Sequence, residues 1–344
     1  MVLTLLAAVF VFGLLVIVHE LGHFITAKLT GMRVDEFAIG FGPKIIGFRR
    51  GETDYTIRAI PLGGFNDIAG MNPADNDAGE RGYCQRPIWA RMVVILAGAA
   101  MNFILPIVLF FGIFTFAGVN TPNPEPVLGQ VIEDKPAYNA GLRDGDKIIT
   151  IDGENINSWQ ELVGAIENKN QPLAVTAMRG DELITAEVEP TFDAKSNRSV
   201  IGVISAVTTT YPSILECLKL AVVSTGKIIY MMLDALYKII LELSGSELAG
   251  PIGVAQMAGE VAQRGIVPLL NFTAFLSLNL GIVNLLPVPA LDGGHFVGLV
   301  VEAVRGKPMS PKALEYTQRI GIVLLLLLMV LATKNDIVRV FTGG

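Results

Sequence analysis

The stretch VIVHELGHFITAK, residues 16–28, places two histidines and a glutamate inside an otherwise apolar segment. His19 and His23 are four positions apart, so they share one face of a helix and both imidazoles can bind a single Zn²⁺ ion. Glu20 lies about 100° around the helix from His19, close enough to act on a water beside the metal. The pattern predicts a zinc site with His19 and His23 as ligands and Glu20 as the catalytic general base.

The composition of the chain puts this histidine pair in a membrane. Hydrophobic residues make up 51% of the 344 positions and charged residues 17%, against about 25% charged in an ordinary soluble chain. Ionisable residues within a membrane span are costly and usually mark function. The composition excludes a disordered or wholly soluble protein. A net charge of −6 without a long basic run argues against nucleic acid as a partner.

A catalytic zinc site needs a third protein ligand and one open position. The first acidic residue after Glu260 is Asp292, which follows PVPAL, residues 287–291, and precedes two glycines. The prolines and glycines break the helix there, and a break at membrane depth is tolerated beside a polar cavity. We therefore predict Asp292 as the third ligand and assign no role to His295.

Four stretches are apolar enough to span a bilayer, which takes about 20 residues. We predict a polytopic α-helical membrane protein with transmembrane segments at 1–28, 92–119, 263–304 and 313–344, the third broken at its Leu-Asp-Gly motif. The N-terminal stretch has no basic region and no cleavage site, so we expect a retained helix rather than a signal peptide.

The regions between the spans differ in character. Residues 29–91 contain short β-prone runs punctuated by glycine and proline, and are expected to form a membrane-associated β hairpin or sheet with a loop. Residues 120–206 are expected to form an inserted α/β module. Residues 207–262 carry charges every few positions, which favours amphipathic helices at the outer interface over a fifth span. Residues 305–312 form a short loop.

The distribution of Lys and Arg predicts the orientation, because cytoplasmic loops carry an excess of them. Nine such residues lie from Lys28 to Arg91, and the loop 305–312 is also basic. We therefore expect these two regions in the cytoplasm. Both termini and the α/β module are expected on the extracytoplasmic side.

The α/β module contains KPAYNAGLRDGDKIITIDG, residues 135–153. This string resembles PDZ domains of the permuted order found in bacterial proteases. The resemblance implies a peptide site in which the ligand adds as a strand beside a glycine-containing loop, here Ile201, Gly202 and Val203. The alternative is a module that binds no peptide and acts by size alone.

The histidine motif in the first span, Leu-Asp-Gly in a late span and a PDZ domain between them resemble the site-2 protease family of intramembrane metalloproteases, and within it the bacterial RseP type. Residues 18–45, 51–65 and 276–296 carry the resemblance. It implies zinc as the cofactor, and a lipid-embedded enzyme of the bacterial inner membrane. The implied substrate is a single-pass membrane protein already cut outside. The product would be a cytoplasmic regulator such as an anti-sigma factor fragment, or a cleared signal-peptide remnant.

The chain departs from the pattern of this family in two places. It has room for one PDZ domain, where its nearest relatives usually have two. After Gly63 and Gly64 it continues Phe65-Asn66-Asp67 instead of Tyr-Val-Lys. We expect this second departure to alter how the β element contacts substrate, and not the zinc chemistry.

Polar residues near the predicted ligands allow more than one interpretation. Asn279 and Asn284 precede Asp292 in the same span, where amides can hold a substrate backbone or an oxyanion or bond helix to helix. Gly98 and Asn102 are expected to serve helix packing. Two other functions stay open, a non-catalytic PDZ scaffold in the membrane and an ion-binding transporter, but neither explains the histidine spacing.

Overall fold

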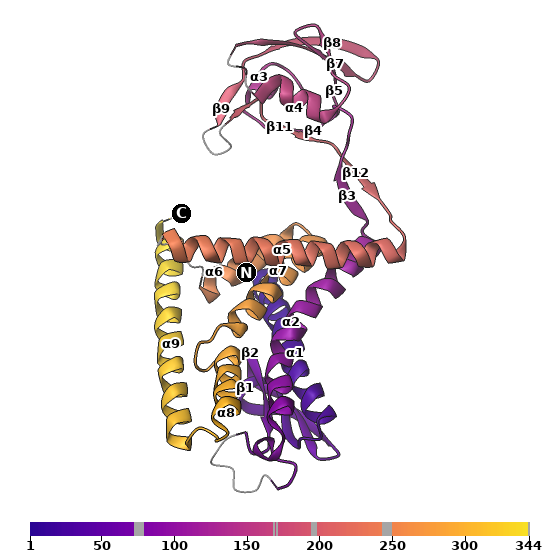
Figure 1. The fold of residues 1–344 in the computed structure, drawn as a ribbon. Coiled ribbons are helices and arrows are strands. Elements are labelled where there is room, and N and C mark those ends of the chain that lie inside the picture. Colours follow the sequence, from indigo (N-terminus) through magenta and orange to yellow (C-terminus); the bar gives the residue numbers. More distant parts are fainter. Residues whose placement is uncertain (72–78, 168, 170, 194–197, 243–249, 343–344) are drawn as a thin grey trace. The chain divides into compact units, whose positions relative to one another are not determined.

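The computed structural model describes residues 1–71, 79–167, 169, 171–193, 198–242 and 250–342. The chain divides into two compact units. Unit 1 consists of Met1–Phe116 and Ser213–Gly344, and unit 2 is the segment Ala117–Pro212 inserted between them. The elements of each unit are labelled in Figure 1.

Among the described residues, four helices of unit 1 are long and apolar enough to cross a membrane. They are α1 (Val2–Leu29), α2 (Ile88–Phe116), α7 (Ile266–Leu285) and α9 (Pro311–Thr342). The helix of the second span begins at Ile88 and not at the predicted Met92. Arg91 does not mark a solvent-exposed end of the helix, because its guanidinium pairs at 2.6 Å with the carboxylate of Glu302 in a later helix.

The predicted third span is interrupted at its prolines. Helix α7 ends at Leu285 and α8 (Asp292–Arg305) follows after six residues, since proline cannot donate its main-chain nitrogen and its ring clashes with the preceding turn. Ala290 within the connection takes a left-handed φ of 73°. Asp292 thereby becomes the first residue of a helix, with Leu291 as the N-cap.

The predicted β element is a pair of long antiparallel strands. They are β1 (Val34–Arg50) and β2 (Thr53–Ile68). Glycines with left-handed φ values lie inside both strands, among them Gly40 at 91° and Gly63 at 99°. Other residues rarely adopt this conformation, so the glycines let each long strand bend back on itself.

The bends turn two strands into a small folded sheet. Segment 34–39 pairs with 64–68 on one side and with 54–57 on the other. Segment 46–50 pairs with the far side of the strand that contains 54–57. Segment 64–68 therefore lies at an edge of the sheet. The sequence predicted a hairpin or sheet here but not this doubled register.

Charged side chains tie the tip of the β element to the end of α1. Glu52 accepts hydrogen bonds from Lys28 at 2.5 Å and from Arg81 at 2.7 Å. The bonds from Arg81 and Lys28 hold the pKa of the Glu52 carboxyl at about 2. The short 3-10 helix Tyr83–Gln85 then leads toward α2.

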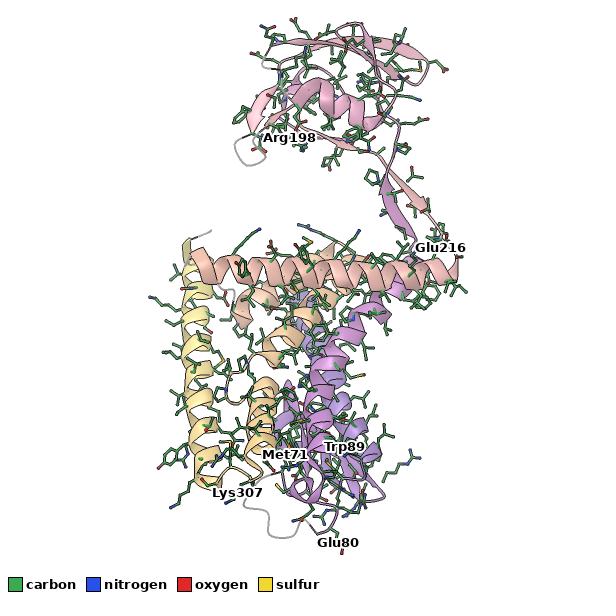
Figure 2. The ribbon with its side chains drawn as sticks, viewed as in Figure 1. Met71, Glu80, Trp89, Arg198, Glu216 and Lys307 are labelled. Carbon is green, nitrogen blue, oxygen red and sulfur yellow. The ribbon has the colours of Figure 1, made fainter. Side chains whose placement is uncertain are left out.

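Two helices occupy the region for which amphipathic helices were predicted. They are α5 (Ile214–Glu242) and α6 (Pro251–Gln263). Figure 1 shows α5 lying across one end of the spans instead of running parallel to them. In Figure 2, Glu216 of α5 is at this end of unit 1, whereas Glu80 and Lys307 are at the opposite end.

Unit 2 folds around its own apolar core, which includes Leu142, Ile148 and Leu162. A four-stranded antiparallel sheet has the order β6-β5-β7-β8, and the other strands pair as β11-β4, β10-β9 and β12-β3. The elements are β3 (Val119–Pro122), β4 (Leu128–Val131), α3 (Pro136–Asn139), β5 (Lys147–Ile151), β6 (Glu154–Asn155), α4 (Trp159–Glu167), β7 (Leu173–Arg179), β8 (Glu182–Val188), β9 (Thr191–Asp193), β10 (Arg198–Val200), β11 (Val203–Ser205) and β12 (Val207–Thr210).

A buried carboxylate stabilises the turn before β5. Asp146 accepts hydrogen bonds from the Arg179 guanidinium and from the main-chain nitrogen of Arg143, each at 2.8 Å. Burial acts to raise the pKa of the Asp146 carboxyl, but these hydrogen bonds outweigh it and leave the pKa below its usual value. The turn between α3 and β5 is thus held by an aspartate from its own sequence.

Candidate metal centre

The two histidines of α1 meet on one face of the helix, as their spacing predicts. Their imidazole Nε2 atoms are 3.2 Å apart, and the rings are nearly perpendicular at 85°. Both side chains are largely shielded from solvent. The helix thus presents two nitrogen ligands to one point.

Asp292 reaches the same point from the first turn of α8. Its Oδ2 atom is 3.4 Å from Nε2 of His19 and 3.5 Å from Nε2 of His23. These three residues form a group whose ligand atoms lie within 4.8 Å of one another. The break between α7 and α8 is what puts the carboxylate at a helix end, where it can turn toward α1.

The three ligand atoms fit a zinc ion. Tetrahedral coordination with bonds of about 2.0–2.1 Å puts neighbouring ligand atoms about 3.3–3.4 Å apart, and the three observed separations are 3.2, 3.4 and 3.5 Å. Oδ2 of Asp292 is buried and has no hydrogen-bond partner among the described residues, as expected of an atom reserved for a metal. Three protein ligands leave a fourth position open, which is the arrangement of catalytic zinc sites.

Each imidazole is oriented through its other nitrogen. Nδ1 of His23 lies 2.8 Å from the main-chain oxygen of Val94 in α2 and donates to it when Nε2 faces the metal. Nδ1 of His19 lies 3.1 Å from the amide of Asn102, also in α2. The Oδ1 atom of that amide is buried without a partner in the described chain, so a half-turn of the amide lets it accept the proton on Nδ1.

Glycines of α1 and α2 make room for this arrangement. A Cβ atom at Gly98 would lie 2.2 Å from Nε2 of His23 and 2.8 Å from Cε1 of His19. A Cβ atom at Gly22 would lie 2.3 Å from the main-chain oxygen of Ala97. Any side chain at Gly98 would therefore displace the imidazoles. The sequence pointed to packing at Gly98, but the structure gives it a direct part in shaping the site.

Glu20 lies next to the histidine pair and is held by the β element. Nδ2 of Asn66, in β2, donates to Oε2 of Glu20 at 2.7 Å and to its main-chain oxygen at 2.8 Å. The sequence predicted that the Phe65-Asn66-Asp67 departure would alter substrate contact alone. That prediction was too narrow, because Asn66 contacts the predicted general base.

The other predicted site residues lie in different surroundings. Asn284 is buried in α7, with its amide 3.5 Å from Nδ1 of His19, whereas Asn279 is exposed on the same helix. In unit 2, Ile201 is buried and Gly202, directly before β11, takes a left-handed φ of 79°. His295 lies in the first turn of α8, where its main-chain nitrogen donates to Leu291.

A histidine pair on a helix apolar enough to span a membrane, joined by an aspartate from the start of α8, is the arrangement of a zinc metalloprotease of the site-2 protease type. The chain matches the model of Peptidase family M50 over residues 7–328 and belongs to that family. It is 34% identical to Regulator of sigma-W protease RasP of Bacillus subtilis (strain 168), over 98% of this chain and 99% of that protein. It is 33% identical to Zinc metalloprotease RasP of Geobacillus kaustophilus (strain HTA426), over 98% of each chain.

The comparisons support the sequence-based identification of the family, of the enzyme class and of zinc as the cofactor. Among solved structures, the PDZ domain of the SdrC-like protein from Listeria monocytogenes is 27% identical. That match has a TM-score of 0.22 and covers 25% of this chain and 93% of that one.

Proposed function

We propose that the protein cleaves single-pass membrane proteins within or near their transmembrane segment, after a first cut on the extracytoplasmic side. The observation that carries this proposal is the convergence of Asp292 with His19 and His23, which lie on a helix long and apolar enough to cross a membrane. A hydrolytic centre in such helices is suited to a peptide bond that lies in or beside the bilayer. The roles of His19, His23 and Asp292 as metal ligands and of Glu20 as general base are part of this proposal.

The chain supplies the proton transfers of the reaction. When bound, zinc provides Lewis acidity toward the scissile carbonyl and the attacking water. Glu20 accepts a proton from that water at its carboxylate and delivers it to the leaving amide nitrogen. The amides of Asn279 and Asn284 are proposed to hold the substrate backbone or the developing oxyanion.

The β element is proposed to hold the unwound substrate. Main-chain hydrogen bonds shield the peptide bonds of a helix, so a transmembrane substrate must become extended before cleavage. The segment 64–68 lies at an edge of the sheet, and an extended peptide can add to such an edge as a further strand. Because the same segment packs beside Glu20, a strand added there would pass close to the general base.

Unit 2 is proposed to act as a PDZ domain that selects trimmed substrates. It would do so by size, or by binding a new C-terminus beside Ile201, Gly202 and Val203 as an added strand. The product would be a cytoplasmic regulator such as an anti-sigma factor fragment, and the name of the Bacillus subtilis relative, which refers to sigma-W, supports this class. Clearance of signal-peptide remnants would use the same chemistry.

The protein is proposed to reside in the bacterial inner membrane with both termini and unit 2 outside. The basic segments 29–91 and 305–312 would then face the cytoplasm. Glu80 and Lys307, which belong to these two segments, lie at the same end of unit 1 (Figure 2). The start of α1 and the end of α9 lie toward the opposite end of unit 1, where α5 crosses (Figure 1).

A substitution of Glu20 tests the proposal. In detergent, with a tagged and pre-trimmed membrane substrate, Glu20→Gln should abolish cleavage while zinc content stays at that of the unmodified enzyme. His23→Ala should lose both zinc and cleavage. Undiminished cleavage by zinc-loaded Glu20→Gln would refute the assignment of the base. Cleavage of soluble peptides, but not of the membrane substrate, would refute the proposed substrate class.

A further inference from the structure

The edge segment of β2, residues 64–68, packs closely against α1 at Glu20. A Cβ atom at Gly64 would be 3.0 Å from Cγ1 of Val16 and 3.2 Å from Cγ of Glu20. These separations are shorter than ordinary van der Waals contact, so the absence of a side chain at Gly64 lets strand and helix approach this closely. The approach brings the next residue on the same face of the strand within hydrogen-bond reach of α1.

Alternation along the strand identifies that residue. Successive side chains of a strand point to opposite faces, so Gly64 and Asn66 share the face toward α1 while Phe65 points away. Phe65 stacks on Phe41 with ring centroids 6.3 Å apart, and the Arg58 guanidinium lies 5.0 Å from its ring. The apolar residue anchors the strand from one side, and the amide of Asn66 is left facing Glu20 on the other.

The amide of Asn66 holds Glu20 at two atoms. Its Nδ2 group donates one hydrogen to Oε2 of the carboxylate at 2.7 Å and the other to the main-chain oxygen at 2.8 Å. The reverse amide orientation would set Oδ1 against two oxygens, so Glu20 itself fixes which way the amide points. Oδ1 is left buried without a partner in the described chain. Bridging main chain and carboxylate restricts the torsions of the glutamate side chain between them.

We propose that Asn66 is a positioning residue, which holds the Glu20 carboxylate in the conformation that serves proton transfer. This inference rests on the assignment of Glu20 as general base in the proposed function. Groups that orient catalytic side chains in this way typically account for about 10–100-fold in activity. The hydrogen bonds of the Asn66 amide in the described structure go to Glu20 and not to the proposed metal ligands, so its loss should act on turnover and not on metal binding.

Two variants of Asn66 separate this role from a structural one. Asn66→Leu keeps the size of the side chain and removes the donor, and Asn66→Asp keeps the shape and turns an oxygen toward the carboxylate. In detergent, with the tagged and pre-trimmed substrate, both should lower kcat by about 10–100-fold. KM, zinc content and Tm should remain close to those of the unmodified enzyme.

An exposed asparagine provides the matched control. Asn271 lies on the surface of α7, and Asn271→Leu should leave kcat and KM unchanged. Unchanged kcat in folded, zinc-loaded Asn66→Asp would overturn the inference, as would a rise in KM at constant kcat or a loss of zinc. If Asn66→Leu fails to fold, Asn66→Asp alone tests the positioning role of Asn66.

The assignment of Glu20 is tested separately by Glu20→Gln. If that variant is inactive while the Asn66 variants turn over normally, the positioning role fails and the proposed function stands. If Glu20→Gln retains activity, the proposed base is wrong.

Discussion

Helices α2 and α9 are both apolar enough to cross a membrane, yet they stand in different relations to the rest of unit 1. Half of the most apolar stretch of α2 is buried, against 11% for that of α9. Helix α2 contributes Gly98, Asn102 and the main-chain oxygen of Val94 to the metal centre. Hydropathy therefore locates a span, but small and polar residues within it distinguish a helix that shapes the site from one that faces lipid.

Helix α9 contacts the rest of unit 1 near Gly321 and near Asp336. A Cβ atom at Gly321 would lie 2.0 Å from the main-chain oxygen of Pro289, in the connection between α7 and α8. Near its other end, the buried carboxylate of Asp336 accepts hydrogen bonds from the main-chain nitrogens of Gly250 and Gly253 at 3.0 and 2.8 Å. These bonds satisfy nitrogens at the start of α6 that have no partner within that helix.

The largest effect is expected at Gly98, where α2 meets the imidazoles. Gly98→Ala should release zinc and lower activity by about 100-fold or more, because the added Cβ would lie 2.2 Å from Nε2 of His23. Zinc content and cleavage of the pre-trimmed substrate measure this. Gly112→Ala in the same helix is the control, since its Cβ would meet nothing within 4 Å. Equal behaviour of the two variants would contradict a special role for Gly98.

A somewhat smaller effect is expected at Asn102. Asn102→Leu should weaken zinc binding or activity by about 10–100-fold, because Nδ1 of His19 loses the partner that orients the ring. Asn102→Asp keeps an acceptor at this place and should retain more of both. The measurement is a titration with a competing chelator. Equal zinc affinity of Asn102→Leu and the unmodified enzyme would show that His19 needs no such partner.

Asp336 should affect stability more than catalysis. Asp336→Ala leaves two main-chain nitrogens of α6 without their acceptor, and a buried unsatisfied group costs about 1–3 kcal/mol. We expect a lower Tm in detergent, with zinc content unchanged below the transition. Loss of zinc at low temperature would show that α9 supports the metal centre and would weaken the contrast with α2.

The smallest effect is expected on the lipid-facing side of α9. Leu326 is 49% exposed, and Leu326→Ala should change the free energy of unfolding by no more than about 0.5 kcal/mol. Activity should also be unchanged. A Tm shift as large as that of Asp336→Ala would indicate that this side of α9 is packed against protein.

The three proposed metal ligands could be predicted from the sequence because each has a local signal. His19 and His23 follow helical spacing, and Asp292 is the lone acid in a long apolar stretch that prolines interrupt. Asn66, Gly98 and Asn102 have no such signal. They reach the site from other segments. Gly98 and Asn102 lie in a span, where glycine or asparagine serves helix packing equally well, and Asn66 lies in a strand.

The fold was predictable where it depends on local composition. The apolar stretches located the helices that are long and apolar enough to cross a membrane, and prolines marked the break between α7 and α8. The start of α2 was misplaced because the charge of Arg91 suggested an aqueous end, while its partner Glu302 lies far along the chain. The doubled register of the β element depends on bends at glycines within the strands. A glycine in the sequence does not show whether the chain bends within a strand or turns between two strands.

With one proposed metal ligand on α8 and two on α1, a bound zinc ion would cross-link distant parts of the chain. Closing so long a loop restricts the unfolded chain, so zinc should stabilise the fold as well as supply chemistry. A chelator would then do more than stop turnover: it would free the first turn of α8, and the connection before it would become the place where the protein first yields to heat or to an added protease.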